Sequence, residues 1–142
     1  MDIKKLFTVP ANPMGADLSL LLMRLVAGSA MMLHGWGKIQ NPFGWMGEGA
    51  WAPGIFQALA AFSEFGGGLA WIIGLLTPLA SMGIGSTMAV AFYSHAILRG
   101  DPFVGRDGSF EKAVLFLCIA LVLFAIGPGR FSLDRVLFGR RV

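Results

Sequence analysis

The chain has 142 residues, of which 56% are hydrophobic and only 13% are charged. In a soluble domain about a quarter of the residues are charged, so this chain has too few charged residues to cover a water-facing surface. The composition therefore predicts a polytopic membrane protein and excludes a disordered or collagen-like chain. The single cysteine, Cys118, excludes an internal disulfide, a dithiol redox pair and a cysteine zinc cluster.

The formal net charge is +3, but the basic residues lie between apolar runs and form no patch of the kind that binds nucleic acid. Basic residues at such positions are typical orientation signals of membrane proteins. We therefore expect membrane lipid around the chain and no nucleic-acid partner.

Four apolar segments are long enough to cross a bilayer, which takes about 20 apolar residues at about 1.5 Å per residue. They are predicted to form helices over residues 18–39, 55–76, 79–98 and 110–126. Between the second and third, the Thr77 hydroxyl can cap a helix and Pro78 suits a first helical turn, which indicates a tight turn between antiparallel neighbours. The sequence predicts an all-α membrane protein, one domain over residues 1–142, folded as an antiparallel bundle of four transmembrane helices.

With four spans, both termini lie on the same side of the membrane. That side would carry six basic residues and the other side four: Lys4, Lys5, Arg130, Arg135, Arg140 and Arg141 against Lys38, Arg99, Arg106 and Lys112. Because basic residues favour the cytoplasmic side, we expect a multi-pass inner-membrane protein with both termini, and the tail over residues 127–142, in the cytoplasm. Arg24 inside the first apolar run argues against a cleaved signal peptide.

Ionisable side chains inside a span cost about 2.5–3.5 kcal/mol each on insertion scales and must face a partner or a cavity. Away from their ends, the expected spans contain four of them: Arg24, His34, Glu64 and His95. From the helical rise, the two histidines lie level, roughly 24 Å from the cytoplasmic end, and Glu64 lies at roughly 18 Å, between them and Arg24. We expect a buried ion pair between Arg24 and Glu64, because a guanidinium keeps its charge and its long side chain can reach across.

These residues also predict a small polar pocket in the outer half of the bundle, built from His34, Glu64 and His95 with Lys38 and Glu111 at its rim. Two imidazoles and a carboxylate at one depth can hydrogen-bond and protonate a quinone, or ligate a metal or a haem. Only the shared depth points to haem, so we expect a quinone, assign no metal site and name no catalytic residue. The alternative is that these groups satisfy one another and only fix the register of the helices.

The segment after the fourth helix has its own pattern. Gly127, Pro128 and Gly129 are expected to end that helix, and Ser132 to cap a short amphipathic stretch with Asp134 in its first turn. The arginines of this tail would lie near anionic lipid headgroups, or would dock a cytoplasmic partner.

Three groups of motifs resemble the DoxX family of small bacterial membrane proteins. They are RLVAG (24–28) and HGWGK (34–38) in the first helix, EFGGG (64–68) and GLLTPLA (74–80) around the second, and GPGRFSLD (127–134) after the fourth, where Gly127, Pro128, Gly129, Arg130 and Asp134 stand out. In this order they extend over nearly the whole chain. The resemblance implies a four-helix inner-membrane protein.

For function, the resemblance implies a link to redox chemistry. Members of the family are membrane subunits of thiosulfate:quinone oxidoreductase in some archaea and membrane partners of superoxide dismutase and a sulfurtransferase in mycobacterial oxidative-stress complexes. The leading hypothesis is therefore a membrane subunit of a quinone-linked redox or oxidative-stress complex, with soluble redox proteins as partners.

Two alternatives stay open. One is a non-catalytic scaffold that recruits soluble redox enzymes through the tail after Gly129. The other is a small-solute transporter, for which four spans leave little room unless the chain forms a homo-oligomer. The sequence does not decide whether the chain is itself an enzyme.

Overall fold

The computed structural model describes residues 4–140, and all side chains from Leu6 to Arg140. These residues fold into helices and, apart from one isolated bridge between Val9 and Arg140, contain no β-structure. The helices are α1 (Lys4–Phe7), α2 (Met14–Ile39), α3 (Gly54–Ile73), α4 (Thr77–Tyr93), the π-helical turn η1 (Ser94–Leu98), α5 (Glu111–Ile126) and α6 (Leu133–Phe138). The expected all-α class with four substantial helices is confirmed. Arg141, counted above in the tail, lies outside the described residues.

The four substantial helices differ in length. α2 and α3 are long and apolar enough to cross a membrane by length and composition. α4 and α5, with 17 and 16 residues, extend only about 25 Å each, and η1 prolongs α4 to Leu98. Four complete spans therefore stay a prediction.

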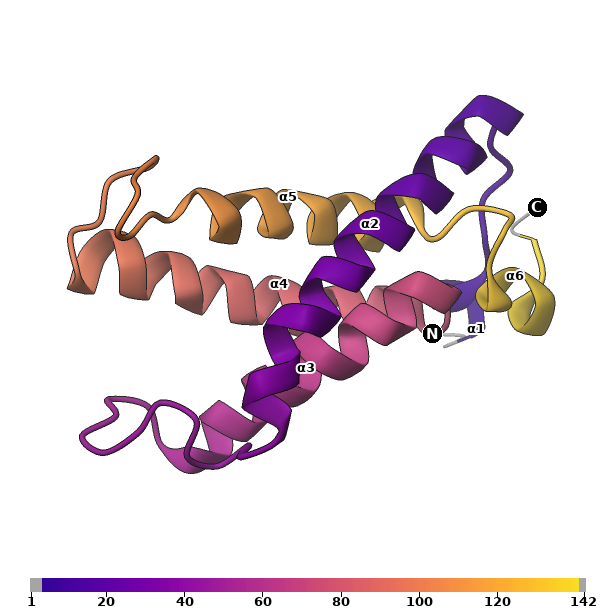
Figure 1. Ribbon diagram of the computed structural model, residues 1–142. Coiled ribbons are helices and arrows are strands. Elements are labelled where there is room, and N and C mark those ends of the chain that lie inside the picture. The colour runs from indigo at the N-terminus through magenta and orange to yellow at the C-terminus, as the bar shows by residue number, and fades with distance from the viewer. Residues whose placement is uncertain (1–3, 141–142) are drawn as a thin grey trace.

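The helices are arranged as two antiparallel pairs, α2 with α3 and α4 with α5, that cross one another (Figure 1). α1 and α6 lie together beside the start of α4 (Figure 1). At the other end of the molecule, the loop between α2 and α3 and the loop between α4 and α5 lie far apart (Figure 1). Residues at the same height on α2 and α4 are therefore not close to one another at this end of the molecule.

Two glycines set the close packing of α2 against α3. A Cβ atom at Gly28 would lie 2.7 Å from the carbonyl oxygen of Gly68, and one at Gly68 would lie 2.6 Å from the main-chain nitrogen of Met32. Only residues without a side chain permit such close contact between helix backbones. This contact fixes the register of the pair, with residue 28 opposite residue 68.

The core lies where the two pairs cross. Trp71, Ile84 and Leu123 come from three different helices and are fully buried. Trp71 also donates a hydrogen bond from its indole nitrogen to the Ser81 hydroxyl of α4, at 3.0 Å. This bond satisfies the polar end of the largest buried side chain.

The turn between α3 and α4 corrects one sequence prediction. α3 ends at Ile73 rather than residue 76, and Gly74 follows in the left-handed conformation with φ 67°. α4 begins at Thr77 with Pro78 in its first turn, but the Thr77 hydroxyl does not cap it and has no hydrogen-bond partner among the described residues. The cap is the Asp134 carboxylate, which accepts hydrogen bonds from the main-chain N–H groups of Leu76 and Thr77 at 2.6 and 2.8 Å. The capping group is thus supplied from a distant part of the chain.

Candidate functional site

Arg24 is buried at the crossing and donates hydrogen bonds to four main-chain carbonyls. Its Nε donates to Trp71 at 2.8 Å and its Nη2 to Ile72 at 3.1 Å. Its Nη1 donates to Pro128 at 2.6 Å and to Phe131 at 2.9 Å. The first two acceptors lie at the carboxyl end of α3, where carbonyls have no partner within the helix. Arg24 therefore joins α2 to the end of α3 and to the tail.

Glu64 forms its ion pair with Lys38 instead, and the expected pair between Arg24 and Glu64 is wrong. The Lys38 ammonium lies 2.5 Å from Glu64 Oε1, and only 3% of the Glu64 side chain is exposed. The antiparallel register explains the exchange. Gly35 packs on the main chain of Phe65, so Lys38, about one turn after Gly35, lies near Glu64, whereas Gly28 opposite Gly68 places Arg24 near the end of α3. Glu64 Oε2 is buried without a hydrogen-bond partner among the described residues.

The loop before α3 covers this ion pair. The Lys38 ammonium lies 4.5 Å from the centre of the Trp45 ring, a cation–π distance. Trp45 donates its indole N–H to the Gln57 carbonyl at 2.9 Å. The buried Gln57 side chain accepts from the main chain of Met46 at 3.0 Å and donates to that of Ala52 at 2.8 Å. Gln57, which sequence reasoning missed, therefore fixes the loop and the position of Trp45.

The two histidines have separate surroundings. His34 is exposed and meets the Phe116 ring of α5 edge-on, with 6.1 Å between ring centres. His95, in η1, pairs through Nδ1 with Asp101 at 2.6 Å, and the Asp101 N–H donates to the His95 carbonyl at 2.9 Å. No hydrogen bond or ion pair within residues 4–140 joins His34, Glu64 and His95. The structure thus unites Lys38 with Glu64 but does not assemble the expected three-residue pocket.

The tail motif is anchored to α2 by a second ion pair. Arg130 donates from Nε to Asp17 Oδ2 at 2.6 Å and from its main chain to Asp17 Oδ1 at 3.0 Å. Asp17 is 1% exposed although it lies in the first turn of α2. The only sequence signal for this contact is an acidic residue beside an apolar run.

The same motif also holds α3, α4 and α6. The Asp134 N–H donates to the Gly74 carbonyl at 2.8 Å while its carboxylate caps α4. Ser132 caps α6 as predicted, accepting from the Arg135 N–H at 3.3 Å, and its hydroxyl donates to the Gly129 carbonyl at 2.7 Å. We call these contacts, with those of Arg24 and Asp17, the tail anchor.

Comparison with known proteins supports the resemblance that the sequence motifs indicate. The model of the DoxX family matches residues 19–96. Over 124 residues the chain is 32% identical to the inner membrane protein YqjF of Escherichia coli (strain K12), covering 85% of this chain and 93% of that protein. This chain belongs to the DoxX family. It is an inner-membrane protein like YqjF, and no solved structure matches it significantly.

The DoxX motifs correspond to the contacts described above. RLVAG and HGWGK supply Arg24, Gly28 and Lys38, EFGGG supplies Glu64 and Gly68, and GPGRFSLD forms the tail anchor. The motifs therefore serve the packing of the helices as well as the Lys38–Glu64 pair.

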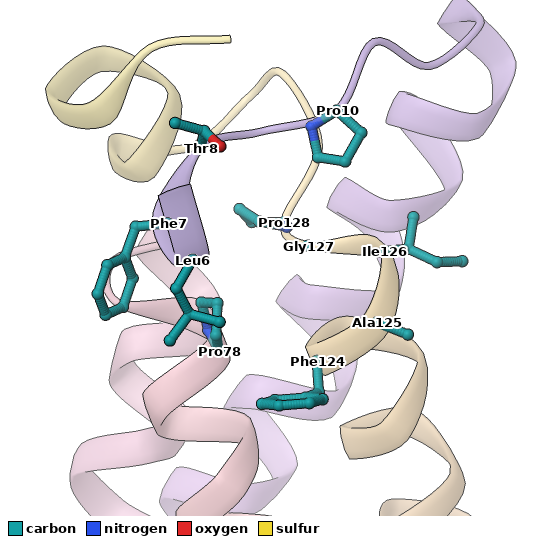
Figure 2. A pocket seen from close by; sticks show the side chains of 10 residues that line it. All are labelled: Leu6, Phe7, Thr8, Pro10, Pro78, Phe124, Ala125, Ile126, Gly127 and Pro128. Atoms are coloured by element: carbon teal, nitrogen blue, oxygen red, sulfur yellow. The ribbon is translucent and has the colours of Figure 1, made fainter. Parts of the chain in front are cut away.

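Two hollows of this DoxX-family chain differ in size. Figure 2 shows the smaller, of about 10 Å³, between α1, the start of α4 and the end of α5; it has room for about one water molecule. A groove of about 480 Å³ runs between α3 and α4 and is lined largely by apolar and small residues. Within the described part of the chain, no three His, Cys, Asp or Glu side chains are grouped so as to hold a metal ion.

Proposed function

We propose that this chain is a membrane subunit of a quinone-linked redox or oxidative-stress complex and that Lys38 and Glu64 form its ligand site. The observation that supports this is the buried Glu64 Oε2, which has no hydrogen-bond partner among the described residues. Leaving such an atom unpaired is costly, so a ligand that donates a hydrogen bond to it would gain that energy.

The pair offers one donor and one acceptor to a ligand. The Lys38 ammonium carries three N–H donors, one of which is used by Glu64. A second can donate to a quinone carbonyl, while Glu64 Oε2 can accept from a quinol hydroxyl. When bound, a quinone supplies redox chemistry that takes up two electrons and two protons. A soluble redox protein would give electrons to the quinone or take them from the quinol.

The neighbouring residues position this pair. Gln57 holds Trp45 against the Lys38 ammonium, which limits how far that side chain can swing away. His34 lies one helical turn before Lys38, on the same side of α2. We therefore propose His34 as the proton-exchanging group, because it is exposed and an imidazole can both accept and donate a proton. His95 has its own partner, Asp101, on the other helix pair.

A binding titration tests this site. The purified protein in nanodiscs is titrated with decylubiquinone and with its quinol, and the quenching of tryptophan fluorescence is followed. The quenching that is lost in Trp45→Phe is the part that comes from Trp45, which lies beside Lys38. Glu64→Gln should weaken quinol binding at least about tenfold, since a hydrogen bond to a charged group contributes about 1.5–3 kcal/mol.

Glu48→Gln, in the exposed loop, is the matched control and should leave binding unchanged. Melting curves confirm that each variant is folded. Wild-type affinity for both ligands in Glu64→Gln and in Lys38→Gln would refute the site.

A non-catalytic scaffold for soluble redox enzymes is the second candidate, and the tail anchor favours it. The anchor fixes residues 127–134 against three helices, so any protein that binds the tail meets a rigid surface. Charge reversal at Arg135 and Arg140, whose side chains are not part of the anchor, should then abolish co-purification of soluble redox proteins. Glu64→Gln should retain it. The opposite pattern would exclude the scaffold.

We also propose four spans with both termini in the cytoplasm. The contact between α1 and α6 supports it, since the Val9 N–H donates to the Gly139 carbonyl and brings both ends of the chain together. The basic bias of the sequence assigns this end to the cytoplasm. A cysteine at position 106 (Arg106→Cys, with Cys118→Ser) should react with an impermeant thiol reagent added to whole spheroplasts, and one at position 140 (Arg140→Cys) only after lysis. Reaction of both from outside would contradict the topology.

A further inference from the structure

α6 is amphipathic in the reverse sense from a helix on a soluble protein. Its acidic residue, Asp134, is fully buried against α4, and Phe138, one turn later, also faces inward. Its apolar residues Leu133, Val136 and Leu137 are 40%, 76% and 63% exposed. They follow the i, i+3, i+4 spacing of one helix face. Water is an unfavourable solvent for such a face.

The contacts around α6 hold this face outward. The Phe7 ring of α1 packs on the Phe138 ring, with 5.1 Å between centres, and the Val9 N–H donates to the Gly139 carbonyl at 3.1 Å. Figure 2 shows α1 between α6 and the start of α4, with Leu6 close to Pro78. α1 and α6 therefore form one unit on the ends of α4 and α5. α6 cannot turn its apolar face inward without breaking the cap that Asp134 gives α4.

The charged side chains beside this face are basic. Asp134 is buried, and Arg130 is paired with the buried Asp17. Arg135 and Arg140 have no ion-pair partner among the described residues. The surface of α6 thus combines an exposed apolar face with two unpaired guanidinium groups.

We propose that the outer face of α6, formed by Leu133, Val136 and Leu137 and flanked by Arg135 and Arg140, lies in the membrane interface and binds anionic phospholipid headgroups. α6 begins seven residues after α5 ends at Ile126, so it lies close to the bilayer surface. At this depth, apolar side chains enter the acyl boundary and guanidinium groups reach phosphate oxygens. Six residues are too few for a helix that is stable alone in water, and the interface supplies surroundings that match both parts of its surface.

The experiment places a fluorophore at position 136 (Val136→Cys in a Cys118→Ser background), with position 48 of the exposed opposite loop (Glu48→Cys) as control. Nanodiscs contain either phosphatidylcholine alone or phosphatidylcholine with phosphatidylglycerol. Lipids brominated in the acyl chain and aqueous iodide serve as quenchers. In anionic nanodiscs, bromolipid should quench position 136 and iodide should not, whereas position 48 should show the reverse.

The charge requirement is tested separately by titrating phosphatidylglycerol into the nanodiscs. Arg135→Gln and Arg140→Gln should each raise the amount needed for half-maximal protection by about fivefold, the equivalent of about 1 kcal/mol per arginine at an anionic surface. Equal protection in neutral nanodiscs would overturn the preference for anionic lipid. Iodide quenching of position 136 in every membrane would overturn the proposal, and so would protection that develops only when a soluble protein is added.

Discussion

Arg24 is the side chain whose replacement should be most informative about the fold. Its guanidinium donates four hydrogen bonds, two to the end of α3 and two to the tail, and it interacts electrostatically with the buried Asp134. Arg24→Leu keeps an apolar side chain but removes the guanidinium donor from four carbonyls and a favourable charge from Asp134, which retains its hydrogen bonds from Leu76 and Thr77. It therefore breaks one of two links between α2 and the tail, the other being the Asp17–Arg130 ion pair.

The magnitude follows from these contacts. Hydrogen bonds to a charged group contribute about 1.5–3 kcal/mol each, so four would sum to about 6–12 kcal/mol. Water can reach part of the freed carbonyls at the end of the helices, and such contributions are not additive. We expect Arg24→Leu to lower the free energy of unfolding by about 3–5 kcal/mol, because several buried carbonyls lose their charged donor. Arg24→Lys should lose about 2 kcal/mol, since an ammonium cannot reproduce the fork.

Two measurements check this prediction. Unfolding by sodium dodecyl sulfate in mild detergent, followed by tryptophan fluorescence, gives the free energies. Trypsin digestion reports on the tail, because Arg24→Leu should expose Arg130 and Arg135 to rapid cleavage. Arg106→Leu, in an exposed loop, is the control and should change stability by no more than about 0.5 kcal/mol. The reasoning is refuted if Arg24→Leu stays within about 1 kcal/mol of the unaltered protein and its tail resists trypsin.

Three further predictions concern single contacts. Gly68→Ala should destabilise the protein by about 1–3 kcal/mol in the same unfolding assay, because its Cβ would clash with the main chain of α2. Gly66→Ala is the control and should be neutral or slightly stabilising, because a Cβ there has nothing within 4 Å. Asp134→Ala should cost at least about 0.5–2 kcal/mol and speed amide hydrogen exchange at the start of α4, and normal protection there would show that another group caps the helix. Lys38→Met should destabilise the protein more than the double variant Lys38→Met/Glu64→Leu does, because only the single variant leaves the buried Glu64 carboxylate unpaired. Additive losses of stability in the double-mutant cycle would contradict this.

Features that depend on one segment at a time can be predicted from the sequence. The apolar runs predicted the four substantial helices to within about four residues at each end when η1 is counted with α4; the largest difference is at α2, which begins at Met14. The Ser132 cap and the end of α5 at Gly127 followed from local residue chemistry. The motifs indicated the DoxX family, which the comparisons confirmed.

Which polar groups meet depends instead on how the helices pack. The heights of residues along separate helices predict an ion pair between Arg24 and Glu64 and two histidines at one level. Which residues pair, however, depends on the register of neighbouring helices and on the angle at which they cross. Close contact of Gly35 with the main chain of Phe65 sets α2 against α3 so that Lys38 reaches Glu64. The crossing of the two pairs gives each histidine a different neighbour. The cap of α4 and the four acceptors of Arg24 come from residues distant in sequence, which no local pattern could reveal because their pairing follows from packing.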